Sequence, residues 1–173
     1  MGRLRSNRAA HVPRGRSWCP PALTKAKTTL DRQEYIEYLL DHFQNPRNRG
    51  RMEGADVQLG GGNPGCGDLI TMYLKIDDDR VSEVSFEGEG CTISQAGGSI
   101  VTELIEGLTL DEIKELGTHT MKEEMGDDVV KSRVRCATLA LGTVQAAIDQ
   151  YRKDRTLAAL SQDAKGLKVT FEN

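Results

Sequence analysis

The sequence predicts an α+β protein, and two patterns support this prediction. Apolar residues alternate over 69–76 and again over 81–87, with the polar turn Asp77-Asp78-Asp79-Arg80 between them. This pattern is typical of an antiparallel hairpin with one buried face. Apolar residues then recur at helical spacing over 93–105 and 134–151, which indicates helices that bury one side.

The composition fits a soluble globular domain with tails. The chain has 173 residues, of which 38% are hydrophobic and 28% charged. No apolar run approaches the ~18 residues of a membrane helix, so we expect no membrane partner. Residues 1–30 hold seven basic residues and no acid, so the rest carries −10 against −3 for the whole chain. An acidic body argues against nucleic-acid binding.

The first 30 residues lack periodicity and predict a disordered tail, in which Trp18 and Cys19 lie outside the core. An Arg-rich, acid-poor start is typical of a transit peptide, although a misassigned start or a vector-derived extension gives the same pattern. No apolar secretory segment is present in it. The location predicted is therefore cytoplasmic, or an organelle matrix if the tail is a transit peptide.

Helix and strand signals follow in order from residue 31. Asp31 is expected to cap a helix that runs to about Phe43 and ends at Asn45-Pro46. A strand begins near Val57. Residues 60–68 hold five glycines and a proline, so we expect a loop there.

The helical half of the chain begins after the predicted hairpin. Gly107 ends the helix predicted over 93–105, and Thr109 with Glu112 forms a capping box for a short helix over 110–116. Residues 118–132 are polar and predict a loop around a possible short helix. The last strong helix is expected over 132–152.

The end of the chain is weakly patterned. Residues 167–171 suggest a small edge strand within a C-terminal tail over 154–173. The predicted organisation is thus a basic tail over 1–30, one domain over 31–153 and this second tail.

Three cysteines share an unusual setting. Cys66 lies on the glycine-rich loop, Cys91 at a strand-to-helix junction, and Cys136 near the start of the last helix. A disulfide framework is not expected in a chain of this length without a secretory signal. A thiol at a helix start has a lowered pKa, so Cys91 and Cys136 are expected to favour the thiolate.

Asp68 adds a carboxylate to this set, because residues two apart in an extended segment point to one side. Three sulfur atoms and one oxygen suit tetrahedral Zn²⁺, or iron on the way to a cluster. Such a set carries −4, so one Zn²⁺ leaves −2, which the neighbouring cations would offset. The four candidate ligands and the three cations are Cys66, Asp68, Cys91, Cys136, Lys131, Arg133 and Arg135.

The spacing of the cysteines leaves a second interpretation open, in which three unrelated thiols simply pack in the core. The histidines are weaker candidates. His42 is expected to be a helix cap or a surface residue, and His119 a solvated side chain in a polar loop.

Four motifs together resemble the U-type iron–sulfur cluster assembly scaffolds, a family that comprises IscU, SufU and the N-terminal domain of NifU. The resemblance covers residues 33–153. The motifs are Tyr38-Leu39-Leu40-Asp41-His42-Phe43-Gln44-Asn45-Pro46-Arg47-Asn48-Arg49-Gly50, Asn63-Pro64-Gly65-Cys66-Gly67-Asp68, Phe86-Glu87-Gly88-Glu89-Gly90-Cys91-Thr92-Ile93-Ser94-Gln95-Ala96 and Arg133-Val134-Arg135-Cys136-Ala137-Thr138-Leu139.

The resemblance implies a small antiparallel three-stranded sheet covered on one side by helices. It implies that Cys66, Cys91 and Cys136 converge at an exposed end, where they and Asp68 hold Zn²⁺ or a nascent [2Fe–2S] cluster. It also implies that a cysteine desulfurase delivers persulfide sulfur there. Cys136 is the expected acceptor in a scaffold, and Cys66 in a zinc-linked relay.

The third motif departs from the IscU pattern and follows SufU. Arg135 stands where IscU has a histidine, and residues 128–133 lack the prolines of the IscU chaperone motif. Arg133 matches an arginine of SufU. The separation of 45 residues between Cys91 and Cys136 is instead IscU-like, because SufU carries an insertion there.

Three functions therefore compete. The first is a scaffold that assembles a transient [2Fe–2S] cluster and passes it to apo-proteins. The second is a zinc-dependent sulfurtransferase that relays persulfide sulfur, with Arg133 beside the reacting cysteine. The third is a structural zinc protein, which exposed glycine-rich cysteine loops do not favour. The sequence leaves the oligomeric state open.

Overall fold

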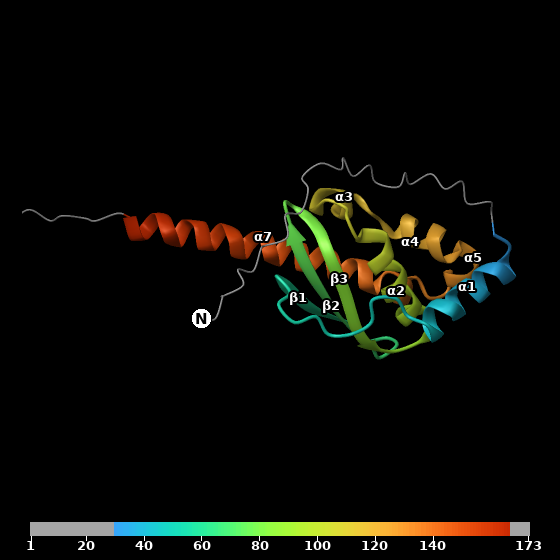
Figure 1. The fold of residues 1–173 in the computed structure, drawn as a ribbon. Helices are drawn as coiled ribbons and strands as arrows, with labels where there is room; N and C mark the ends of the chain where they lie inside the picture. Colours follow the sequence, from blue (N-terminus) through green and yellow to red (C-terminus); the bar gives the residue numbers. More distant parts are fainter. Residues whose placement is uncertain (1–29, 167–173) are drawn as a thin grey trace, which may run out of the picture.

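The computed structural model describes residues 30–166, with side chains described for 30–160. Figure 1 shows one sheet with helices against it. The elements in chain order are α1 (Arg32–Gln44), β1 (Val57–Asn63), β2 (Asp68–Asp77), β3 (Arg80–Glu89), α2 (Thr92–Ile105), α3 (Leu110–Glu115), α4 (Thr118–Met125), α5 (Asp127–Val130), α6 (Val134–Ala137) and α7 (Leu139–Gly166).

The three strands form one antiparallel sheet in the order β1-β2-β3. Alternate residues of β2 point inward, so Ile70, Met72 and Leu74 are buried beneath the helices. The α+β prediction and the predicted hairpin are both confirmed. The register also pairs Asn63 with Asp68, which fixes a tight turn at one end of the sheet.

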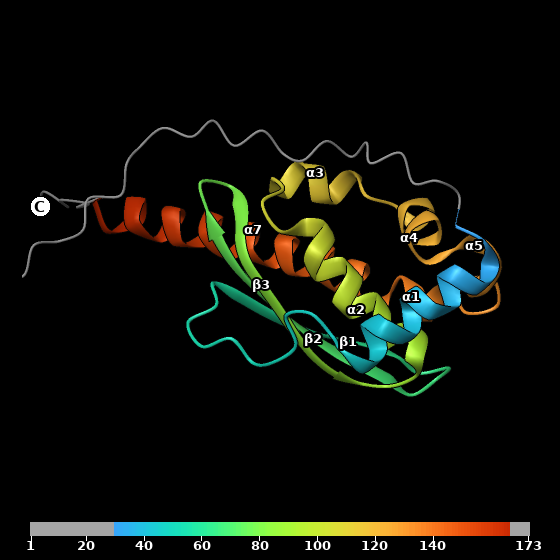
Figure 2. The same cartoon turned by 45° about the vertical axis from the view of Figure 1, so that its right-hand side comes forward.

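The core lies between the sheet and the helices α2 and α7, which pack on it, while α1 packs on α2 (Figure 2). Gly98 of α2 allows this close approach. A Cβ atom there would lie 2.8 Å from the ring of Phe86. Among residues 30–166, no helix is both long and apolar enough to cross a bilayer.

The glycine-rich stretch differs from its prediction in part. Gly60, Gly61 and Gly62 belong to β1 rather than to a loop, and they pair with β2. The reason is a contact far away in the sequence. A Cβ atom on Gly61 would lie 2.0 Å from Thr143 Oγ1, so β1 packs against α7 only where the strand lacks a side chain.

The helical half holds more helix than predicted. Residues 118–130 form two helices, α4 and α5, rather than a loop around one. The predicted helix over 132–152 is two helices, α6 and α7, with Thr138 between them. Its predicted end near Arg152 is wrong, because α7 continues to Gly166.

The extra turns of α7 bury little apolar surface, since Leu157 and Leu160 are exposed. Good helix formers such as Ala158 and Ala159 favour the helix without packing. The predicted edge strand over 167–171 and residues 1–29 of the tail predicted over 1–30 lie outside the described residues. The domain limits at 31 and 153 stay predictions.

Candidate metal centre

The first cysteine is held by the turn that joins β1 to β2. The backbone N–H groups of Cys66 and Gly67 both donate to the carbonyl oxygen of Asn63, at 3.1 and 2.9 Å. Gly67 has φ +71°, a left-handed conformation that favours glycine. The turn leaves the Cys66 thiol exposed to solvent.

Asp68 opens β2 and is fully buried. Its Oδ1 accepts the backbone N–H of Cys91 at 2.8 Å. Burial by itself raises the pKa of Asp68, but hydrogen bonds from the Cys91 N–H, the Cys136 thiol and the Ser94 hydroxyl outweigh burial. The pKa of Asp68 therefore lies below its ordinary value, and the residue is a carboxylate.

Cys91 is the N-cap of α2, and its thiol caps no backbone N–H. Gly90, just before it, has φ +155°. A Cβ atom on Gly90 would lie 2.4 Å from Asp68 Oδ1 and 2.7 Å from Ser94 Oγ. Glycine is therefore required here so that the start of α2 can pack against the buried carboxylate.

Cys136 lies in the single turn of α6 and is 1% exposed. Its Sγ lies 3.3 Å from Cys66 Sγ. Burial raises the pKa of the Cys136 thiol, and the neighbouring Asp68 carboxylate and the other two cysteines raise it further. The expectation that a helix start lowers the pKa of Cys136 is wrong, because burial next to acidic groups outweighs one helical turn.

The ligand atoms of Cys66, Asp68 and Cys136 all lie within 4.8 Å of one another. Cys91 adjoins this group through the carboxylate, with its Sγ 4.0 Å from Asp68 Oδ2. The four predicted ligands thus come together, three of them in one compact group. Sulfur with a single carboxylate is a donor set that suits Zn²⁺ or iron.

The comparisons with known proteins agree with this geometry. Residues 34–158 match the family described as NifU-like N terminal domain. The chain belongs to this family. The resemblance noted above is confirmed, because proteins named IscU and SufU match this chain at 30–38% identity.

Several curated relatives carry the name iron-sulfur cluster assembly scaffold protein. IscU 1 of Archaeoglobus fulgidus is 38% identical over 121 residues, which cover 69% of this chain and 78% of the relative. IscU of Escherichia coli K12 is 34% identical over 125 residues, which cover 70% of this chain and 96% of the relative.

A structural neighbour has a title that names a putative scaffold for the SUF system, SufU of Fervidobacterium islandicum AW-1. It has a TM-score of 0.57, is 30% identical, and the match covers 65% of this chain and 94% of that one. A NifU-like protein of Brucella abortus has a TM-score of 0.59 at 23% identity and supports the fold alone.

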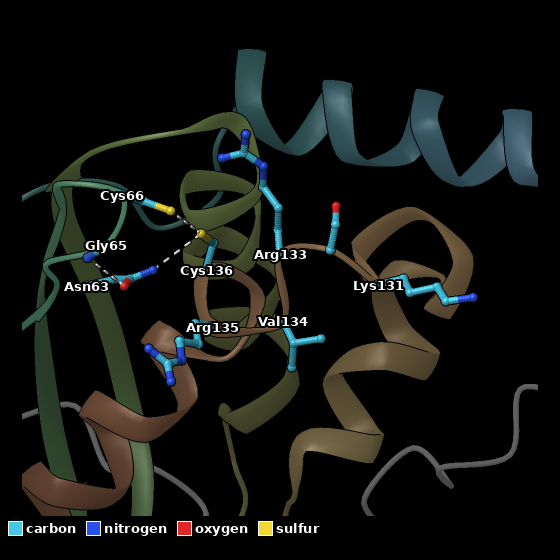
Figure 3. A pocket seen from close by; sticks show the side chains of 9 residues that line it. Asn63, Gly65, Cys66, Lys131, Arg133, Val134, Arg135 and Cys136 are labelled. Atoms are coloured by element: carbon cyan, nitrogen blue, oxygen red, sulfur yellow. Dashed lines mark hydrogen bonds between the residues drawn. The ribbon is translucent and has the colours of Figure 1, made fainter.

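An open hollow of about 660 Å³ adjoins Cys66 and Cys136 of this NifU-like domain. In Figure 3 Arg133 lies on the side of the sulfur atoms, whereas Lys131 and Arg135 extend away from them. The three cysteines raise the pKa of Arg133 above its ordinary value. Of the three predicted cations, only Arg133 thus faces the site.

His42 differs from its prediction and lies in the core rather than at the cysteine site. It was predicted as a cap or surface residue, but it is 1% exposed, and its Nδ1 lies 2.8 Å from Ser99 Oγ in α2. The sequence signal for the burial of His42 was its position three residues after Leu39, on the apolar stripe of α1. His119 is exposed as predicted and pairs with Glu123.

Asn63 belongs to the first cysteine motif, but the sequence predicts no role for it. Its side-chain amide nitrogen lies 3.4 Å from Cys136 Sγ. The sequence signal for a role of Asn63 at the site was its position three residues before Cys66, in a motif whose glycines shape the turn.

Proposed function

We propose that this protein is an iron–sulfur cluster assembly scaffold. In this proposal it accepts sulfur from a cysteine desulfurase, assembles a transient [2Fe–2S] cluster on Cys66, Asp68, Cys91 and Cys136, and transfers the cluster to apo-proteins. The observation that carries the proposal is the convergence of Cys66, Asp68 and Cys136 within 4.8 Å, in a chain whose relatives are named as scaffolds.

The exposure of Cys66 supports it as the first sulfur acceptor. Its thiolate attacks the outer sulfur of a desulfurase persulfide, the S–S bond breaks, and the desulfurase thiolate leaves. The transferred sulfur then takes two electrons from an external reductant to become sulfide. Burial of Cys136 weighs against the acceptor role that the family resemblance gave it.

Asp68 and Arg133 supply opposite charges around this chemistry. The Asp68 carboxylate adds the fourth donor and is held in place by the Cys91 N–H. The Arg133 guanidinium faces the sulfur atoms and offsets part of the negative charge that three thiolates bring together. An oxygen donor among sulfurs also leaves one ligand that exchanges more readily with an acceptor protein.

A second candidate function is a zinc-dependent sulfurtransferase of the SufU type. The position of Arg133 beside the sulfur atoms favours it, because this arginine is part of the SufU-like form of the third motif. In that case Zn²⁺ stays bound to the same four residues, and Cys66 relays the sulfur.

Anaerobic reconstitution tests the proposal. The protein is incubated with ferrous iron, cysteine and a desulfurase, then desalted and analysed by visible absorption and for iron and sulfide. We expect cluster absorption bands with about two iron and two sulfide per cluster. Cys136→Ser should lose the cluster, and Cys19→Ser, a cysteine outside the predicted site, should keep it.

The outcomes separate the two functions. A Cys136→Ser variant that still assembles the cluster contradicts the scaffold proposal. Tightly held zinc, no colour and a several-fold faster desulfurase turnover support the sulfurtransferase. Asp68→Ala divides them again, because it should retain the cluster for longer in a scaffold and mainly weaken zinc binding in a sulfurtransferase.

A further inference from the structure

Asn63 connects the first cysteine motif to the third. It ends β1 and is only 7% exposed. Its backbone oxygen accepts the N–H groups of Cys66 and Gly67, which form the turn that presents Cys66. Its side-chain amide also contacts Cys136 Sγ. One residue therefore places two of the candidate ligands.

The orientation of the Asn63 amide follows from its two contacts (Figure 3). Oδ1 accepts the N–H of Gly65 at 3.3 Å, so Nδ2 faces Cys136 Sγ at 3.4 Å. The flipped amide would set its NH₂ against the Gly65 N–H and its oxygen against the sulfur. The turn thus selects the orientation that gives Cys136 a hydrogen-bond donor.

The Cys136 sulfur needs this donor. It is buried, and the Asp68 carboxylate and the Cys66 sulfur lie beside it. A thiolate in such surroundings is costly unless a polar group stabilises it. Hydrogen bonds to ligating sulfurs also tune the affinity and the electronic properties of a metal site.

We propose that Asn63 is a positioning residue that fixes the Cys66 turn and donates an N–H···S hydrogen bond to Cys136 when this cysteine binds a metal or a cluster. The inference rests on the proposed function, since it takes Cys136 as a ligand. It adds to the four ligands and Arg133 a residue that acts through Cys136 and does not touch the cargo.

Two substitutions separate the parts of this role. Asn63→Ala removes both side-chain contacts. Asn63→Asp keeps the shape and the acceptor for Gly65, but it replaces the donor with a negative oxygen that faces the Cys136 sulfur. We expect about 10- to 100-fold weaker Co²⁺ binding for Asn63→Ala and a larger loss for Asn63→Asp. Gln58→Ala, an exposed position on the opposite face of β1, is the matched control.

The sulfur-to-cobalt charge-transfer band gives a readout that a merely structural role would not move. Loss of the N–H···S bond should shift this band to lower energy in both Asn63 variants, and Gln58→Ala should leave it unchanged. Metal-free protein gives an independent test by NMR. Cys136→Ala should shift one of the two side-chain amide protons of Asn63.

Each result bears on one claim. Asn63→Ala with wild-type Co²⁺ affinity and an unchanged charge-transfer energy overturns the inference, as does an unshifted Asn63 amide in metal-free Cys136→Ala. If Cys136→Ser binds Co²⁺ like the wild type, Cys136 is no ligand and the proposed function fails first. The metal-free NMR spectrum still decides the Asn63 contact if either Asn63 variant fails to fold.

Discussion

The start of α2, at the cysteine end, differs from the starts of α1 and α3. At α1 and α3 the N-cap side chains of Asp31 and Thr109 accept backbone N–H groups, and Glu34 and Glu112 accept the N–H of the N-cap in return. At α2 the N-cap is Cys91, which caps nothing with its side chain. The helices α1 and α3 thus have capping boxes built from their own residues, whereas α2 does not.

The missing half of the capping box at α2 comes from another element. The N-cap N–H of Cys91 donates to Asp68 Oδ1 of β2, where α1 and α3 use a glutamate of their own first turn. In this arrangement the Cys91 thiol, a candidate metal ligand, has no capping role. The hydrogen bond also connects the candidate carboxylate ligand to the helix start. A site residue here doubles as a structural contact between strand and helix.

The largest expected effect comes from making α2 resemble the capped helices. Serine is a far better N-cap than cysteine, so Cys91→Ser should raise the free energy of unfolding by up to about 1 kcal/mol. It should also weaken Co²⁺ binding by at least about 100-fold, more than is usual for a residue outside the ligand set. Urea unfolding and Co²⁺ titration measure the two effects. Retained Co²⁺ affinity would show that Cys91 is no ligand, with Cys19→Ser as the control.

A second contrast lies within α2, between its open start and its middle. Ser99 Oγ contacts His42 Nδ1 and accepts the backbone N–H of Arg47, each at 2.8 Å. His42 Nε2 faces Glu103 at 3.7 Å, and the ring packs edge-on against Tyr38. The polar groups of this cluster are paired with one another, so the cluster has no open ligand position and acts as a structural link between α1 and α2.

The His42 link predicts an acid-sensitive fold. Burial, together with the charge of Arg47 and against the opposing charge of Asp41, lowers the pKa of His42 from 6.5 to about 4. Below pH 6.5 the unfolded chain binds a proton that the folded state does not take up until about pH 4. The contribution of His42 to the free energy of unfolding is therefore fully present above pH 6.5. It falls with acidification, by about 2 kcal/mol at pH 5.

Urea unfolding at pH 7.5 and at pH 5 measures this term. His42→Asn should lose it, whereas His119→Ala, which changes an exposed histidine, should keep the pH dependence of the wild type. An equal pH dependence in His42→Asn and the wild type would assign the acid sensitivity to other groups.

These contrasts explain what the sequence can predict. Capping boxes and alternating strands depend on neighbours within four residues, so α1, α3 and the hairpin were predicted correctly. The end of α7 was not, because its apolar stripe stops at Tyr151 while its helix-forming residues continue. The glycine-rich pattern predicts a loop at Gly61, because the Thr143 contact that requires glycine there lies 82 positions away.

Some features of the candidate site can likewise be predicted from the sequence, and others cannot. The convergence of the cysteines was predicted from motif resemblance, since Cys66 and Cys136 lie 70 residues apart and their spacing follows no local rule. The burial of Cys136, the outward direction of Arg135 and the contact of Asn63 with sulfur all depend on tertiary packing. Residue types thus indicated the chemistry, and packing determined which thiol is accessible.

The smallest expected effect tests the capped side of the comparison. Thr109→Ala removes the acceptor for the Glu112 N–H at the start of α3 and should lower the free energy of unfolding by about 1 kcal/mol. Thr156→Ala makes the same change in an exposed interior turn of α7, where alanine favours the helix, and should not destabilise the protein. Both variants should bind Co²⁺ like the wild type. A weaker site in Thr109→Ala would mean that the two kinds of helix start are coupled, because the loss of a cap at α3 would then reach the cysteines through the core.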